Sequence, residues 1–166
     1  LGFEANEGKC KVMEVAPYGS PKYTYEVWKI VVQNDDGTYW LDQEYFFFHY
    51  STKTSYNAEV HRPVWRAENT SISPFHPGQR VPVILWGAPQ LKELCHYNQR
   101  FADIAASIQE VTEELILSLV CQIHRETGLT NLCLAGGVAL NSVANGRILR
   151  ETPFEELYVQ PSAGDG

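Results

Sequence analysis

Two glycine-rich segments near the end of the 166-residue chain carry the residues best suited to chemistry. The first is Gly136-Gly137-Val138, and the second is segment 162–166, in which Asp165 stands between glycines. Backbone N–H groups left open by glycines before a helix suit a phosphate or another anion. A carboxylate facing a bound phosphate needs a cation between the two charges. The pattern favours a metal–nucleotide site, although the same residues are also typical of ordinary turns.

The elements around these segments are predicted to form a strand–helix–strand unit. The apolar run 132–135 predicts a buried strand, residues 139–150 a helix, and residues 157–159 a second strand. Because one helix connects them, the two strands are expected to be parallel and the crossover right-handed. The loops after the strands then meet at the edge where open α/β sheets bind ligands. The apolar side of the helix is expected to consist of Leu140, Val143, Ala144, Ile148 and Leu149.

The chain before this unit is predicted to combine helices, short strands and an irregular middle. Helices are expected over residues 11–16, 21–33 and 103–128, and an aromatic hairpin over residues 38–41 and 45–50. Residues 51–94 contain five prolines and read as an irregular insertion. The longest helix is expected to pack on the sheet through an apolar stripe formed by Ile104, Ile108, Val111, Leu115, Leu119 and Ile123.

Composition narrows the class of protein. The net charge of −7 argues against a surface for nucleic acid or anionic membranes, which would need clustered Lys and Arg. No apolar run approaches the roughly 20 residues of a membrane span. The four cysteines have no short metal-binding spacing, and Cys121 and Cys133 fall in apolar runs. Buried free thiols in a reducing compartment, hence a cytoplasmic protein, are the expectation.

Three segments together resemble one family. They are EGKCKVMEVAPYG (7–19), ADIAASIQEVTEELIL (102–117) and AGGVALNSVANGRIL…FEELYVQPSAGDG (135–166). In this order they resemble the carbamoyltransferase family that includes nodulation-type and antibiotic-tailoring O-carbamoyltransferases. The resemblance implies an α/β fold, part of an actin/hexokinase/sugar-kinase-like (ribonuclease H-like) domain with a mixed sheet and packed helices. It also implies a relation to the tRNA threonylcarbamoyl-transfer proteins.

The resemblance implies a domain organisation and a reaction. Residues 1–166 would be part of a nucleotide-binding domain, with an N-terminal part and a C-terminal adenylating domain missing. The whole protein would use ATP and carbamoyl phosphate to form carbamoyl-adenylate, with a divalent metal ion, iron or magnesium. It would pass the carbamoyl group to a hydroxyl group of a sugar or natural-product acceptor. A homodimer is compatible with this picture, and the isolated chain is expected to be inactive.

The resemblance also implies roles for individual residues. Lys11 would be catalytic, acting on the phosphates or the carbamoyl group, and its ordinary alternative is a solvated helix lysine. Asp165 would bind the metal ion together with histidines from outside this chain. Asn141 would bond ribose or phosphate, whereas Asn145 could equally be a helix-surface packing residue. The residues expected to contact the nucleotide are Glu7, Gly8, Gly136, Gly137, Val138, Asn141 and Asn145.

Two other functions stay open. A sugar or acid kinase of the same fold would use similar phosphate turns, and the absence of a GxxxxGK[ST] run excludes only a P-loop kinase. The chain could instead be a structural or interaction module without catalysis. The resemblance of segment 7–19 is what favours carbamoyl transfer.

Overall fold

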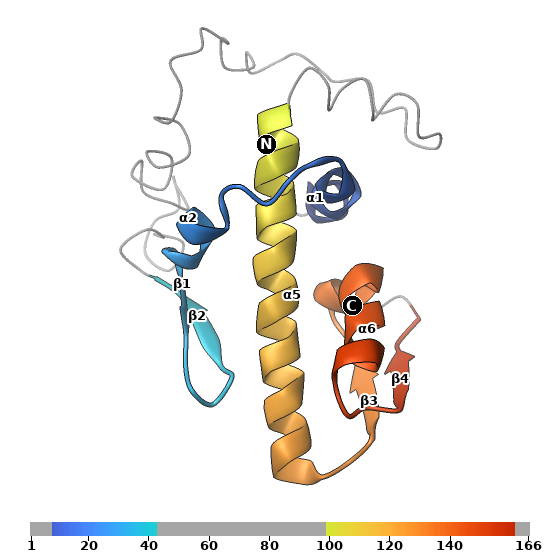
Figure 1. Cartoon of the computed structure of the whole chain (residues 1–166). Coiled ribbons are helices and arrows are strands. Elements are labelled where there is room, and N and C mark those ends of the chain that lie inside the picture. The colour runs from blue at the N-terminus through green and yellow to red at the C-terminus, as the bar shows by residue number, and fades with distance from the viewer. Residues whose placement is uncertain (1–7, 43–98, 162–166) are drawn as a thin grey trace, which may run out of the picture. The chain divides into compact units, whose positions relative to one another are not determined.

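The computed structural model describes residues 8–42 and 99–161 (Figure 1). The chain divides into two compact units, Leu1–Ile30 with Leu41–Gln109 and Val31–Trp40 with Glu110–Gly166. Helix α5 (Gln99–Thr127) contributes residues to both units. The predicted strand 45–50 and the predicted insertion 51–94 lie outside the described residues. In the ranges that the structure describes, no helix combines the length and apolar character needed to span a membrane.

The first unit begins with helix α1 (Gly8–Val15), which confirms the helix predicted over residues 11–16. A 3-10 turn, η1 (Ala16–Tyr18), follows because Pro17 cannot continue an α-helix. The chain then passes close to α5: a Cβ atom at Gly19 would lie 2.0 Å from the carbonyl oxygen of Ala102. The absence of a side chain at Gly19 permits this approach to the backbone of Ala102, which is fully buried.

The helix predicted over residues 21–33 is wrong in its second half. Helix α2 covers only Thr24–Trp28 and is followed by strand β1 (Val31–Gln33). Strand β1 pairs with β2 (Tyr39–Leu41), and their turn places Gly37 at φ 79°. The predicted strand 38–41 is thereby confirmed, and it forms a hairpin with β1, while its predicted partner 45–50 lies outside the described residues. A short apolar run fits a helix and a strand equally well. Here the β-branched residues Val31 and Val32 form a strand because they can pair with β2.

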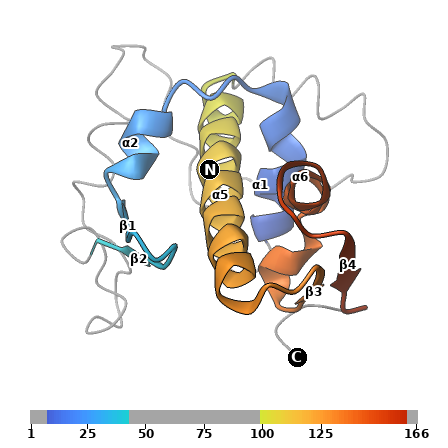
Figure 2. The same ribbon diagram turned by 60° about the horizontal axis from the view of Figure 1, so that its bottom comes forward.

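The second unit contains the predicted strand–helix–strand arrangement. Strand β3 (Asn131–Leu134) pairs in parallel with β4 (Glu156–Val159), and helix α6 (Ser142–Glu151) connects them. In Figure 2 α6 is seen nearly end-on beside the two strands. The core of the unit lies between α5, the strands and α6, and it consists of Val120, Leu132, Ile148 and Phe154.

Helix α6 differs from its prediction in its start and in its buried face. A 3-10 turn, η3 (Gly137–Leu140), precedes it, so the α-helix begins at Ser142 rather than at residue 139. Ala144 and Ile148, four residues apart and therefore on one face, are buried. The other three residues of the predicted apolar side are about half exposed: Leu140, Val143 and Leu149.

Helix α5 confirms the longest predicted helix and begins four residues earlier than predicted. Gly128 ends it with φ 66°, and the Gly128 N–H donates to the carbonyl of His124 at 2.8 Å. The predicted apolar stripe is only partly correct. Val111 and Leu115 are buried, whereas Ile108 and Ile123 lie at the surface. The buried face of the first turns is instead built from small residues, among them Ala102, Ala105 and Ser107.

The described cysteines correct the expectation of buried thiols. Cys133 is exposed and Cys121 is partly buried, and both are free thiols. Side chains alternate between the two faces of a strand, so the inward position of Leu132 turns Cys133 outward.

Candidate functional site

Parallel pairing of β3 and β4 brings the carboxyl ends of the two strands to one edge of the sheet. Leu134 is paired with Val159 at the end of the ladder, and the N–H of Gln160 donates to the carbonyl of Leu134 at 3.1 Å. The turn that begins at Gly136 and the segment that follows Gln160 therefore leave the sheet side by side. Asp165, the predicted metal ligand, follows in that segment but lies outside the described residues.

Gly136 has a backbone conformation that other residues avoid. Its φ of 92° and ψ of 166° fall in a region that is almost restricted to glycine. Space is not the reason for glycine here, because a Cβ atom would have no neighbour within 4 Å. The backbone conformation of Gly136 is what turns the chain from β3 into η3.

The turn from Gly136 to Asn141 is closed by backbone hydrogen bonds. The Ala139 N–H donates to the Gly136 carbonyl at 3.0 Å, and the Asn141 N–H donates to the Val138 carbonyl at 2.9 Å. The amides of Gly137 and Val138 precede Ala139, which carries the first N–H bonded within this turn. Amides at the start of such a turn, next to the start of α6, suit an anion such as a phosphate.

The two predicted asparagines both bond to the protein backbone. Asn141 is the N-cap of α6: its Oδ1 accepts from the Ala144 N–H at 3.2 Å, and the residue is buried. Asn145 is the fourth residue of α6, and its Nδ2 donates to the carbonyl of Ala139 at 2.8 Å. The structure thus brings Gly136, Gly137, Val138, Asn141 and Asn145 together around one turn. Their contacts with a nucleotide stay a prediction.

The residues predicted from the N-terminal segment belong to the other unit. Gly8 is the first residue of α1. Glu7 and the side chain of Lys11 lie outside the described part of the chain, so their roles stay predictions. Among the described residues, no three His, Cys, Asp or Glu side chains are grouped so that they could hold a metal ion.

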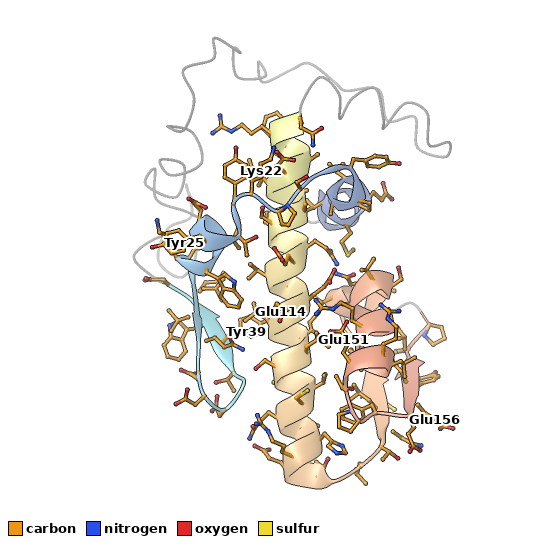
Figure 3. The ribbon with its side chains drawn as sticks, viewed as in Figure 1. Lys22, Tyr25, Tyr39, Glu114, Glu151 and Glu156 are labelled. Atoms are coloured by element: carbon orange, nitrogen blue, oxygen red, sulfur yellow. The ribbon has the colours of Figure 1, made fainter. Side chains whose placement is uncertain are left out.

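A buried carboxylate in the first unit was not singled out from the sequence for any site. Asp103, 3% exposed, accepts hydrogen bonds from the Ser20 N–H at 2.8 Å, the Lys22 Nζ at 2.7 Å and the Gln99 Nε2 at 2.9 Å. Figure 3 shows Lys22 beside the first turns of α5. Burial by itself would raise the pKa of Asp103, but these three donors outweigh it and hold the pKa below its usual value.

The neighbouring turn of α5 continues this attachment. Ser107 is fully buried, accepts from the Tyr23 N–H at 2.9 Å and donates to the Asp103 carbonyl at 2.6 Å. Asp103 and Ser107 therefore fix segment 20–23, which follows α1 and η1, to α5. The partners are more than 80 residues apart in sequence, so no local signal could have revealed them.

A charge cluster joins α5 to α6 in the second unit. The Arg147 guanidinium contacts Glu113 at 3.0 Å, Glu114 at 2.9 Å and Glu151 at 2.8 Å. Glu114 and Glu151 are labelled in Figure 3 on the two helices. The hydrogen bond with Glu151 and those with Glu113 and Glu114 raise the pKa of Arg147, despite partial burial, so the side chain stays charged. This cluster orients α6 and hence the turn that precedes it.

The family comparison covers the whole chain. Residues 1–166 match the sequence model of the protein family described as "Carbamoyltransferase N-terminus". An uncharacterized protein of Synechocystis sp. is 41% identical over 169 residues, which cover 99% of this chain and 23% of that protein.

Two shorter matches carry names. The nodulation protein NolO of Bradyrhizobium diazoefficiens is 41% identical over 69 residues, covering 42% of this chain and 13% of NolO. The tRNA N6-adenosine threonylcarbamoyltransferase of Fervidobacterium nodosum is 38% identical over 64 residues, covering 39% of this chain and 19% of that protein. In each case the matched segment covers less than a quarter of the relative's length.

Proposed function

The chain belongs to the carbamoyltransferase N-terminus family, and from this premise we propose that it is the nucleotide-binding part of an ATP-dependent carbamoyltransferase. The whole protein would take the carbamoyl group from carbamoyl phosphate and pass it, as carbamoyl-adenylate, to a hydroxyl group of a sugar or natural-product acceptor. The family description and the similarity to a tRNA N6-adenosine threonylcarbamoyltransferase support this class of reaction.

The single observation that carries the proposal is the shared edge of β3 and β4. There β3 and β4 end side by side in parallel register, and the Gln160 N–H donates to the Leu134 carbonyl. The Gly136 turn follows β3, and the part of the sequence that contains Asp165 follows Gln160. Backbone amides of Gly137 and Val138 would donate to a phosphate group of the nucleotide, and α6 would add the positive end of its dipole. A ligand held by backbone amides requires no basic side chains, which agrees with the acidic net charge of −7.

The reaction explains why such a site is useful. A carbamoyl carbonyl is a poor electrophile, and attachment to AMP supplies a better leaving group. In the transfer step the acceptor hydroxyl oxygen attacks the carbamoyl carbon, the bond from that carbon to the AMP oxygen breaks, and a base takes the hydroxyl proton. Donors fixed at the phosphate stabilise the negative charge that develops on AMP.

The remaining predicted residues would contact the nucleotide or bind the metal ion. Glu7, Gly8 and Lys11 would approach the nucleotide, with the Lys11 ammonium directed to the phosphates or to the carbamoyl oxygen. Asp165 would bind a divalent metal ion, iron or magnesium, because a carboxylate is a common ligand of both. Such an ion would supply charge stabilisation at the phosphate. Asn141, which caps the start of α6, would bond the ribose or a phosphate of the nucleotide.

Calorimetric titration with ATP, with and without a divalent metal ion, tests this proposal. The protein of natural length should bind ATP, and Gly136→Ala should weaken binding at least about tenfold, since strain of about 1–3 kcal/mol would distort the turn. Gly128→Ala is the matched control, because Gly128 also has a positive φ and open space around its Cβ position. Asp165→Ala should remove the effect of the metal ion. If neither Gly136→Ala nor Asp165→Ala changed the affinity for ATP, the nucleotide would bind elsewhere.

A further inference from the structure

We propose that Asn145 is a positioning residue that holds the Gly136 turn in the shape needed for nucleotide binding. The inference rests on the proposed function. It differs from a direct contact with the nucleotide, because Asn145 would act through the backbone of Ala139.

The argument starts from the two polar backbone atoms of Ala139. The Ala139 N–H donates to the carbonyl of Gly136 at 3.0 Å, and the Ala139 carbonyl accepts from Nδ2 of Asn145 at 2.8 Å. Ala139 is itself 5% exposed. Two successive hydrogen bonds through one buried residue therefore connect Gly136 to α6.

The geometry of the peptide bond explains what this connection fixes. The peptide unit is planar, so holding the Ala139 carbonyl sets the orientation of the whole unit between residues 139 and 140. Rotation of that unit would disturb η3, whose first residues are Gly137 and Val138. The proposed phosphate donors belong to those two residues, and a change in their direction would reach the ligand without any change in the residues that contact it.

Helix α6 is a firm base for this contact. Ile148, one turn after Asn145, is fully buried in the core of the unit, and Arg147 is bound to two glutamates of α5. The Asn145 side chain therefore projects from an element that is fixed on both sides. A fixed donor is what distinguishes a positioning residue from a surface amide that follows the motion of the loop.

The chain offers a close control for Asn145. Asn131 is also an asparagine of the same strand–helix–strand unit, and its Nδ2 donates to Glu156 Oε2 at 3.1 Å. It is the first residue of β3, at the opposite end of the strand from the Gly136 turn. Removing its amide deletes an exposed hydrogen bond to a carboxylate, also donated by an asparagine Nδ2, without touching the turn.

The experiment compares Asn145→Ala, Asn145→Asp and Asn131→Ala in the protein of natural length. Asn145→Asp keeps the size of the side chain but replaces the donor by a carboxylate that faces a carbonyl. Both Asn145 variants should weaken ATP binding about tenfold, the effect of losing one hydrogen bond of about 1.4 kcal/mol. Asn131→Ala should change it less than about twofold. Asn145→Gln, which keeps an amide donor, should recover part of the affinity.

Hydrogen exchange of the amides of residues 137–141 supplies the second measurement. The Asn145→Ala and Asn145→Asp variants should exchange faster at this turn, whereas Asn131→Ala should match the wild type. If ATP binding weakens while exchange at the turn is unchanged, Asn145 contacts the nucleotide directly and the positioning role is wrong. Equal ATP affinity in Asn145→Ala and Asn131→Ala would overturn the inference and leave the proposed function intact. A wild-type protein that does not bind ATP would overturn both.

Discussion

At the scale of single residues, Asp103 holds together segments that are distant in sequence. Its carboxylate accepts from Ser20, Lys22 and Gln99 while the residue is almost fully buried. A buried carboxylate stays charged only where donors replace the lost water. The Lys22 side chain is 63% exposed, so solvent screens its ion pair. The hydrogen bond from the Ser20 N–H to the Asp103 carboxylate is partly buried and therefore matters more.

Asp103→Asn should therefore lower the free energy of unfolding by about 1–3 kcal/mol at neutral pH, because the amide cannot accept from all three donors. Lys22→Ala is the comparison and should cost less than about 1 kcal/mol. Urea unfolding curves of the two variants measure the difference. Equal costs for both variants would mean that the exposed ion pair, rather than the buried carboxylate, stabilises the contact.

The pH dependence of the same contact has a definite sign. Hydrogen bonding places the pKa of folded Asp103 below the usual value of 3.8, so the unfolded chain takes up a proton first as the pH falls. Its contribution to stability is complete above that unfolded value and is lost as the pH falls through the lower folded pKa. The stability gap between the wild type and Asp103→Asn should narrow below pH 3.8. A gap that stays constant in acid would contradict the assignment.

At the scale of elements, close backbone contact fixes the segment after η1 to α5. A Cβ atom at Gly19 would lie 2.0 Å from the Ala102 oxygen and 2.2 Å from the Ala102 carbonyl carbon, and neither backbone atom can move without moving the helix. Gly19 has φ −105°, a value open to any residue, so the requirement for glycine is purely steric.

Gly19→Ala should destabilise the chain by about 3 kcal/mol, because the added methyl group forces α5 and the loop apart. Gly128→Ala, where only backbone strain opposes the change, should cost about 1–2 kcal/mol. Thermal unfolding of the two variants gives the comparison. A smaller effect at Gly19 than at Gly128 would show that the loop does not lie against Ala102.

Local sequence patterns predicted the elements whose partners are near in sequence. The β3–α6–β4 unit and the Gly128 end of α5 followed from apolar runs, glycines and proline. The helix over residues 21–33 failed, since the choice between helix and strand at Val31 depended on pairing with β2 across a turn. The edge that joins the Gly136 turn to the segment before Asp165 was predictable from topology. The hydrogen bond from Asn145 to Ala139 and the contacts of Asp103 depend on packing that no pattern of spacing encodes.

At the scale of the whole molecule, the chain distributes its predicted residues over two units. The first unit carries Gly8 and Lys11, and the second carries Gly136, Asn145 and Asp165. The hairpin tip also joins the second unit, since a Cβ atom at Gly37 would lie 3.1 Å from the Ser118 carbonyl oxygen of α5. Residues from both early and late parts of the chain thus build each unit.

The isolated 166-residue chain should show no carbamoyl transfer, because the relatives that it matches over its full length are more than four times as long. An assay with carbamoyl phosphate, ATP and a hydroxyl-bearing acceptor, run beside the protein of natural length, checks this. Turnover by the protein of natural length shows that the assay works. Turnover by the isolated chain would mean that all catalytic groups lie within these residues.

Because Cys133 points outward, the reactivity of its thiol reports whether this face of the sheet is exposed to solvent. The thiol is exposed on β3, paired in register with the exposed Tyr158 on β4, on the face opposite Leu132 and Leu157. Parallel strands are normally covered on both faces. Alkylation of Cys133, followed by mass mapping of its peptide, should therefore be rapid in the isolated chain. In the protein of natural length, a slower rate would mean that further polypeptide lies over this face, and an unchanged rate would mean that the face stays open to solvent.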